Sequence, residues 1–239
     1  MKPDLLLLPG LTCDAAVWAH QAATLSAVAN PIVPAWGLLN SLSDMARLAL
    51  SQSQQDRIWV AGHSMGARVA LEMWRLAPER IAGLALLDTG AHPRAEGEAG
   101  DKEERARMAL LGIAQRQGMR AMGSQWARGM VHESRRDSAV FDAILDMQER
   151  SSAAQFEAQI QALLSRPDAR PLLSTITCPL WLLCGEDDAW SPPAQHQAMA
   201  DLVPHATLTL IPTCGHMSPM EQPEAVSQWL LDWWQATAA

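Results

Sequence analysis

Short apolar runs alternate along this chain with longer stretches of helical period, and this alternation restricts the possible folds more than any other feature. It is typical of βαβ units, in which helices cover both faces of a parallel sheet. The sequence therefore predicts an α/β fold. The predicted strands span residues 4–8, 30–35, 57–61, 81–88, 179–184 and 206–211, and the predicted helices span residues 15–27, 43–54, 65–76, 193–202 and 223–235.

One segment, residues 91–170, breaks this rhythm. It opens with a polar, Gly-containing run at 95–101 and continues as amphipathic helices with no strand between them. We therefore expect a helical cap, residues 91–170, inserted into a core made of residues 1–90 and 171–239. Thioethers and large aromatic rings suit a deformable pocket wall. The candidate wall residues are Trp126, Met130, Trp190 and Met217.

Charge and composition exclude several classes of partner. The chain of 239 residues has 18 Lys and Arg against 26 Asp and Glu, a formal net charge of −8, and no basic cluster. This balance argues against nucleic acid and anionic membranes as partners. The four leucines before Pro9-Gly10 are too few for a signal peptide or a membrane span, so we expect a cytoplasmic protein. The four cysteines lack metal-site spacing, which predicts reduced thiols and no metal.

A G-x-S-x-G motif stands where one predicted strand gives way to a helix. The motif, residues 62–66, follows the apolar run 57–61 and precedes a stretch of helical period. This context is typical of a nucleophile elbow, a tight turn that raises a serine hydroxyl above the sheet and needs small neighbours. Gly62 and Gly66 satisfy that need, and Ser64 is the predicted nucleophile.

A serine becomes a good nucleophile only beside a base, which a carboxylate usually orients. His216 lies in a loop after the last predicted strand, at the sheet edge where parallel sheets gather catalytic groups. Asp188 follows the preceding strand in Gly-Glu-Asp-Asp and is the favoured acid. Its neighbour Asp187 and Asp88, at the end of another strand, stay open as alternatives.

The oxyanion that forms during acyl transfer needs about two hydrogen-bond donors. Met65 begins the helix that follows the elbow, where free amides and the helix dipole favour negative charge. Leu11 lies in the loop after the first strand, at the same edge of the sheet. The backbone N–H groups of Leu11 and Met65 are therefore the predicted donors.

The order of these motifs, from Leu-Pro-Gly at residues 8–10 to Gly-His at residues 215–216, resembles the α/β-hydrolase superfamily. Among its members, the chain is similar to small carboxylesterases and 3-oxoadipate enol-lactonases. The resemblance implies a sheet of about six mostly parallel strands with a helical insertion, and no metal or organic cofactor. It also implies Ser64 as nucleophile, Asp188 as acid and His216 as base, with Leu11 and Met65 as oxyanion donors. Many relatives have His-Gly where this chain has Pro9-Gly10.

The expected activity is hydrolysis of a small to medium carboxylic ester or lactone through an acyl-enzyme. A carbon–carbon bond hydrolase, a perhydrolase or an acyltransferase would use the same three residues, because the motif does not separate these chemistries. Substrate turnover and acceptor competition would distinguish them. A non-catalytic ligand-binding protein is the alternative of another class, which labelling by an active-site serine reagent would exclude.

Overall fold

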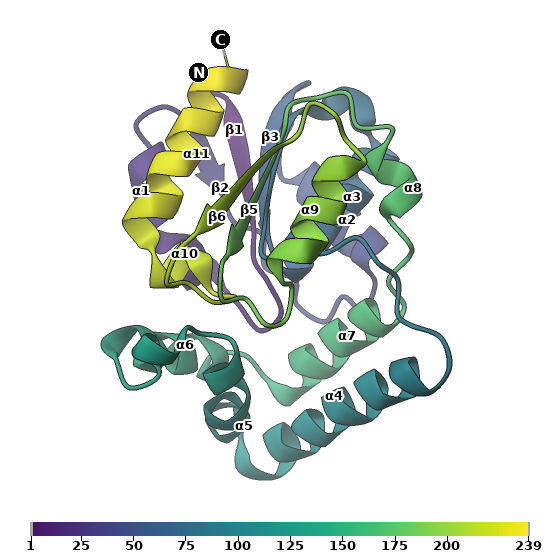
Figure 1. The fold of residues 1–239 in the computed structure, drawn as a ribbon, viewed down its shortest axis with the longest axis vertical. Coiled ribbons are helices and arrows are strands. Elements are labelled where there is room, and N and C mark those ends of the chain that lie inside the picture. The colour runs from purple at the N-terminus through teal and green to yellow at the C-terminus, as the bar shows by residue number, and fades with distance from the viewer. Residues whose placement is uncertain (1, 239) are drawn as a thin grey trace.

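Six parallel strands form a single sheet in the computed structural model, which describes residues 2–238 (Figure 1). The order across the sheet is β2-β1-β3-β4-β5-β6, and every neighbouring pair is parallel. The predicted α/β class, with a mostly parallel sheet of about six strands, is therefore confirmed. The strands are β1 Asp4–Leu8, β2 Asn30–Ile32, β3 Ile58–His63, β4 Ile81–Leu87, β5 Leu180–Gly185 and β6 Thr207–Ile211.

Helices cover both faces of the sheet, as Figure 1 shows. Successive side chains of a strand point to opposite faces. Leu6 and Leu8 of β1 accordingly pack into one apolar cluster, and Leu5 and Leu7 into the other. One face carries α2 (Leu42–Ser51), α3 (Met65–Leu76) and α9 (Pro193–Asp201), and the other carries α1 (Ala19–Leu25) and α11 (Pro223–Thr237). The inner strands β1, β3, β4 and β5 are buried on both faces and almost continuously apolar, whereas the edge strands β2 and β6 are partly exposed.

Two elements near the N-terminus are shorter than predicted. Strand β2 stops at Ile32 rather than at residue 35; it is an edge strand, and Pro34 has no N–H group to extend the ladder. The helix predicted over residues 15–27 is divided into a 3-10 turn, Ala15–Trp18, and α1. Asp14 caps the turn by accepting a hydrogen bond from the Ala16 N–H.

Between β4 and β5 the chain is helical. Its helices are α4 Gly97–Gln117, α5 Met119–Trp126, α6 Ala139–Glu149, α7 Ala153–Leu164 and α8 Arg170–Leu173, with 3-10 turns at Ala127–Gly129 and Glu133–Arg135. In Figure 1, α4 to α7 lie together beyond one end of the strands. The division into a core and a cap of residues 91–170 stays a prediction. Two short elements complete the chain, the 3-10 turn Pro78–Arg80 and α10 Ser218–Glu221.

The helices within residues 2–238 include none that combines the length and the apolar character needed to cross a bilayer. The longest, α4, has 21 residues and carries many charged side chains. The four cysteines, Cys13, Cys178, Cys184 and Cys214, are free and buried. Burial raises the pKa of Cys13 and of Cys178 to about 12, so both thiols stay protonated at neutral pH.

Candidate active site

Ser64 occupies the turn between β3 and α3 in a backbone conformation that side chains rarely adopt. Its φ is 54° and its ψ is −115°, and its N–H donates to the Leu87 carbonyl at 2.8 Å. A Cβ at Gly66 would lie 2.1 Å from the Leu8 carbonyl oxygen, and one at Gly62 would lie 2.6 Å from the Ala67 Cα. Both glycines are therefore required for the turn to pack against its neighbours.

A chain of hydrogen bonds links Ser64 to a carboxylate through one imidazole. The Ser64 Oγ lies 2.8 Å from the His216 Nε2, and the His216 Nδ1 lies 2.8 Å from the Asp188 Oδ2. The other oxygen of Asp188 accepts the N–H groups of Trp190 and Ser191 at 2.8 and 2.9 Å. The structure thus brings together the three residues predicted as nucleophile, base and acid.

The electrostatic surroundings of His216 and Asp188 favour a protonated imidazole. Burial disfavours the imidazolium of His216, but the charge and hydrogen bond of Asp188, with the charges of Asp88 and Glu221, outweigh this effect, and the pKa of His216 is raised. Burial also disfavours the carboxylate of Asp188. The charge of His216 and the hydrogen bonds that Asp188 accepts nevertheless lower the pKa of its carboxyl group. The pair is therefore arranged to stabilise positive charge on the imidazole and negative charge on the carboxylate.

The two alternative carboxylates lie elsewhere. Asp187 is half exposed, and its Oδ2 lies 3.8 Å from the His132 Nε2. Asp88 is fully buried and accepts hydrogen bonds from the Ser218 Oγ at 2.5 Å and the Gly185 N–H at 3.1 Å. Burial, together with the charge of Asp188, raises the pKa of Asp88 well above its usual value. Neither side chain contacts the His216 Nδ1.

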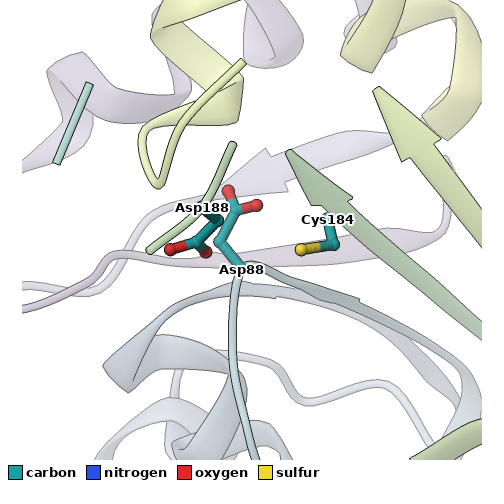
Figure 2. Close-up of side chains that lie close together, drawn as sticks. All are labelled: Asp88, Cys184 and Asp188. Carbon is teal, nitrogen blue, oxygen red and sulfur yellow. The ribbon is translucent and has the colours of Figure 1, made fainter. Parts of the chain in front are cut away.

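Asp88, Cys184 and Asp188 are the one group of potential metal ligands within residues 2–238, with ligand atoms within 4.8 Å of one another (Figure 2). The oxygen atoms of both carboxylates already accept hydrogen bonds from backbone or side-chain donors. Burial also raises the pKa of the Cys184 thiol, which disfavours the thiolate that a metal would need. The cluster therefore fits a buried hydrogen-bond network better than an ion site.

The two predicted oxyanion donors face the same cavity as Ser64 and His216. Leu11 lies in the loop after β1, and Met65 is the first residue of α3. Among residues 2–238, neither backbone N–H donates a hydrogen bond to another residue of the chain. Both amides are therefore free to bind an oxygen atom next to Ser64.

A cavity of about 440 Å³ opens above Ser64. Three of the predicted wall residues, Trp126, Met130 and Trp190, line it. The Trp190 ring centroid lies 5.2 Å from that of His216 and 4.9 Å from that of Trp126. Met217 does not reach the cavity: its side chain is fully buried in the apolar cluster on the α11 side of the sheet.

Glu221 contacts the loop that holds His216, and no sequence motif pointed to it. Its buried carboxylate accepts the N–H groups of Gly215 at 3.1 Å and Met217 at 3.0 Å, on either side of His216. It also accepts the His132 N–H at 2.7 Å. The His216 N–H donates to the Met130 carbonyl at 2.5 Å. The loop that holds the base is therefore fixed to residues 130–132 of the helical insertion.

His63, inside the elbow motif, supports the base from the opposite side. Its Nε2 lies 2.7 Å from the His216 carbonyl oxygen, and its ring centroid lies 5.5 Å from that of His216. Burial and the charge of His216 lower the pKa of His63 to about 3. His63 is therefore a neutral packing residue at physiological pH.

Comparison with known proteins confirms the predicted α/β-hydrolase fold. The model of the alpha/beta hydrolase family matches residues 5–229. The pimeloyl-[acyl-carrier protein] methyl ester esterase of Aromatoleum aromaticum is 28% identical over 93% of the chain and 94% of its own length. A 2-succinyl-6-hydroxy-2,4-cyclohexadiene-1-carboxylate synthase of Salmonella arizonae is 28% identical over 71% of the chain and 65% of its own length.

Solved structures extend this similarity. A thermophilic esterase of Thermogutta terrifontis superposes with a TM-score of 0.88 at 26% identity, covering 100% of this chain and 92% of its own. The enol-lactonase of Burkholderia xenovorans superposes with a TM-score of 0.83 at 20% identity, covering 98% of this chain and 92% of its own. The enol-lactonase, at this identity, supports the fold alone.

Proposed function

The chain belongs to the alpha/beta hydrolase family, and from this premise we propose that it hydrolyses carboxylic esters or lactones of small to medium size through an acyl-enzyme. One observation carries the proposal. The hydrogen bonds from Ser64 through His216 to Asp188, at 2.8 Å each, form the arrangement that acyl transfer by a serine requires. The names of two similar proteins, both esterases, support the same reaction class.

In the first half of the reaction, His216 removes the proton from the Ser64 hydroxyl through its Nε2 as the oxygen attacks the substrate carbonyl. Asp188 keeps the Nδ1 proton in place and stabilises the imidazolium. The carbonyl oxygen becomes an oxyanion, to which the amides of Leu11 and Met65 donate hydrogen bonds. The bond to the leaving oxygen then breaks, His216 gives its proton to that oxygen, and an acyl group remains on Ser64.

In the second half, water replaces the leaving group. His216 takes a proton from the water as its oxygen attacks the acyl carbonyl, and the same two amides stabilise the second oxyanion. The bond to Ser64 breaks as His216 returns the proton to the serine oxygen. The products are a carboxylic acid and an alcohol, or a hydroxy acid when the substrate is a lactone.

The cavity supports a limit on substrate size. About 440 Å³ lies within the range of small-molecule pockets. The aromatic rings of Trp126, Phe156 and Trp190 form part of its wall. A short acyl or aryl group fits this enclosure better than a long polymer does.

The test is hydrolysis of p-nitrophenyl acetate and p-nitrophenyl butyrate, together with labelling by a fluorophosphonate followed by intact mass. We expect wild type to turn over and to gain one label, and Ser64→Ala to lose both. Acceptor alcohols added to the assay separate hydrolysis from acyl transfer. Wild type that is folded yet neither labels nor hydrolyses any short ester would refute the proposal.

A further inference from the structure

Three arginines line the cavity that contains Ser64. Arg68 comes from α3, Arg107 from α4, and Arg166 follows α7. Glu103, also on α4, is the one carboxylate among the lining residues. The wall of this cavity therefore carries an excess of positive charge, although the chain as a whole has a net charge of −8.

Arg166 has a structural role, because protein groups accept its hydrogen bonds. Its guanidinium donates to both oxygens of Glu103 at 2.8 Å, in the bidentate geometry of a strong pair. It also donates to the carbonyl groups of Leu163 and His92 at 2.7 and 3.3 Å. Its donors are thus engaged, and Arg166 links α4 and α7 to the segment after β4.

Arg68 and Arg107 have donors to spare. A guanidinium carries five N–H donors. Within residues 2–238, Arg68 donates only to the His92 carbonyl, at 2.9 Å, and forms no ion pair with a carboxylate. Arg107 contacts Glu103 through its Nε and one terminal nitrogen, at 3.0 and 2.9 Å. The Glu103 carboxylate therefore pairs with both Arg107 and Arg166. Arg68 has no carboxylate partner within residues 2–238.

The surroundings of Arg68 disfavour its positive charge. Burial and the charge of Arg166 lower the pKa of Arg68 to about 9, because both disfavour its cation. Burial also lowers the pKa of Arg107. A desolvated cation without a counter-charge is stabilised by any anion that reaches it. Arg68, which is partly buried, is therefore able to bind an anion that enters the cavity.

The position of Arg68 relates the spare donors to the reaction. Its backbone N–H donates to the Ser64 carbonyl at 3.4 Å, so Arg68 lies one helical turn after Ser64, the N-cap of α3. Both side chains also line the same cavity, so one ligand can contact both.

We propose that the substrate is an ester or lactone that carries a carboxylate, and that Arg68 and Arg107 bind this carboxylate while the reacting carbonyl lies at Ser64. This inference rests on the proposed function and specifies its substrate class. Arg166 and Glu103 act as positioning residues, since their bidentate pair fixes α4 and with it the guanidinium of Arg107.

The activity test compares monomethyl glutarate with dimethyl glutarate, which differ by one negative charge. For wild type we expect a kcat/KM for the monoester that is about tenfold higher or more, the scale of hydrogen bonds to a charged group. Arg68→Gln and Arg107→Gln should bring the ratio of the two kcat/KM values towards one. Arg68→Lys, which keeps the charge but loses the planar fork, should give an intermediate ratio.

The matched control is Arg105→Gln, which removes one positive charge from an exposed site on α4 outside the cavity. It should keep the wild-type ratio and rates. The second readout needs no turnover: calorimetric titration of free glutarate into Ser64→Ala, and into the same variant combined with Arg68→Gln. We expect binding to Ser64→Ala and a loss of about tenfold or more in the double variant.

The outcomes separate this inference from the proposed function. Equal kcat/KM values for the two esters, unaltered by either arginine variant, would overturn the carboxylate site while leaving the esterase proposal intact. Glutarate binding that depends on Arg68, in a protein that hydrolyses no ester, would support the carboxylate site and refute the esterase proposal. Absence of glutarate binding to folded Ser64→Ala would count against the inference.

Discussion

Asp188 reaches His216 with one carboxylate oxygen, at 2.8 Å from the Nδ1, while two backbone amides hold its other oxygen. The carboxylate is therefore fixed before any substrate arrives, and it sets the tautomer of the imidazole. Asp88, on the neighbouring strand, instead bonds to Ser218 and Gly185. Two buried carboxylates in one site thus have different partners and different expected roles.

Asparagine at each position should separate these roles. Asp188→Asn is expected to lower kcat for p-nitrophenyl butyrate by about 10⁴-fold, the loss known for the equivalent change in the serine-protease triad. Asp88→Asn keeps one acceptor oxygen, and because Asp88 does not contact the His216 Nδ1 the change should cost about tenfold or less in kcat. Steady-state kinetics on both variants checks this, and similar losses from the two changes would contradict it.

The pH profile should report the Asp188–His216 pair. Only the neutral imidazole accepts the Ser64 proton, so activity falls as His216 protonates. Because the pKa of His216 is raised above 6.5, the acid limb of kcat/KM should have its midpoint above that pH. In Asp188→Asn the limb should move to lower pH. A wild-type midpoint below the ordinary histidine value would speak against this ion pair.

The fold should lose stability as the solution is acidified, because two histidines are buried in the neutral form. The pKa of His63 is lowered to about 3 and that of His196 to about 4, in both cases chiefly by burial. Below the unfolded value near 6.5, the unfolded chain therefore binds protons that the folded chain does not. Their stabilising effect is complete above that pH and is lost towards pH 4 and 3.

Each such histidine contributes up to about 1.4 kcal/mol per pH unit within its window. Urea unfolding at several pH values measures how the free energy of unfolding changes with pH. His196→Gln should lower by one the number of protons taken up on unfolding. Glutamine can still accept the Thr89 N–H, which lies 2.9 Å from the His196 Nε2. An unchanged slope in this variant would show that the assignment is wrong.

The elbow should tolerate no side chain at Gly66. Its Cβ would lie 2.1 Å from the Leu8 carbonyl oxygen, a backbone atom that cannot move aside cheaply. Gly66→Ala is expected to destabilise the fold by about 1–3 kcal/mol, the usual range for overpacking, and to abolish activity. At Gly112 the neighbour is the flexible Arg116 side chain, so Gly112→Ala should be neutral or stabilising by up to about 1 kcal/mol. Chemical denaturation and ester hydrolysis compare the two.

Glu221 should position the base without touching substrate. In Glu221→Gln, an NH₂ group replaces one acceptor oxygen and faces backbone donors. We expect a loss of about 1–3 kcal/mol in stability and about a hundredfold in kcat, with a smaller effect on KM. Glu224→Gln, at an exposed site nearby, is the control and should behave as wild type. A kcat unaffected by Glu221→Gln would refute the positioning role.

Much of the fold could be read from local patterns. The βαβ alternation predicted all six strands, because a strand buried on both faces is a continuous apolar run bounded by turn residues. The elbow was predictable for a similar reason, since Gly62 and Gly66 at fixed offsets from Ser64 meet a local steric demand. The bounds of β2 and α1 were less accurate, because edge pairing and 3-10 turns depend on neighbours distant in sequence.

The sequence did not predict the direction in which individual side chains of the site point. Asp187 and Asp188 are adjacent and chemically identical, and only the turn after β5 directs one inward and the other outward. Met217 lies next to His216 yet points into the core. Glu221 ends the short helix α10 and lies just before α11, where an acidic residue is ordinary, and its three backbone partners meet only in the folded chain.

The attachment of His216 to residues 130–132 has a mechanical consequence. The Met130 carbonyl accepts the His216 N–H, and Glu221 accepts the His132 N–H, so this part of the helical insertion is joined directly to the loop of the base. An outward movement of residues 130–132 would draw the imidazole of His216 away from Ser64 and stop catalysis. Substrate must therefore enter without displacing residues 130–132, because their movement would take the base out of reach of the serine.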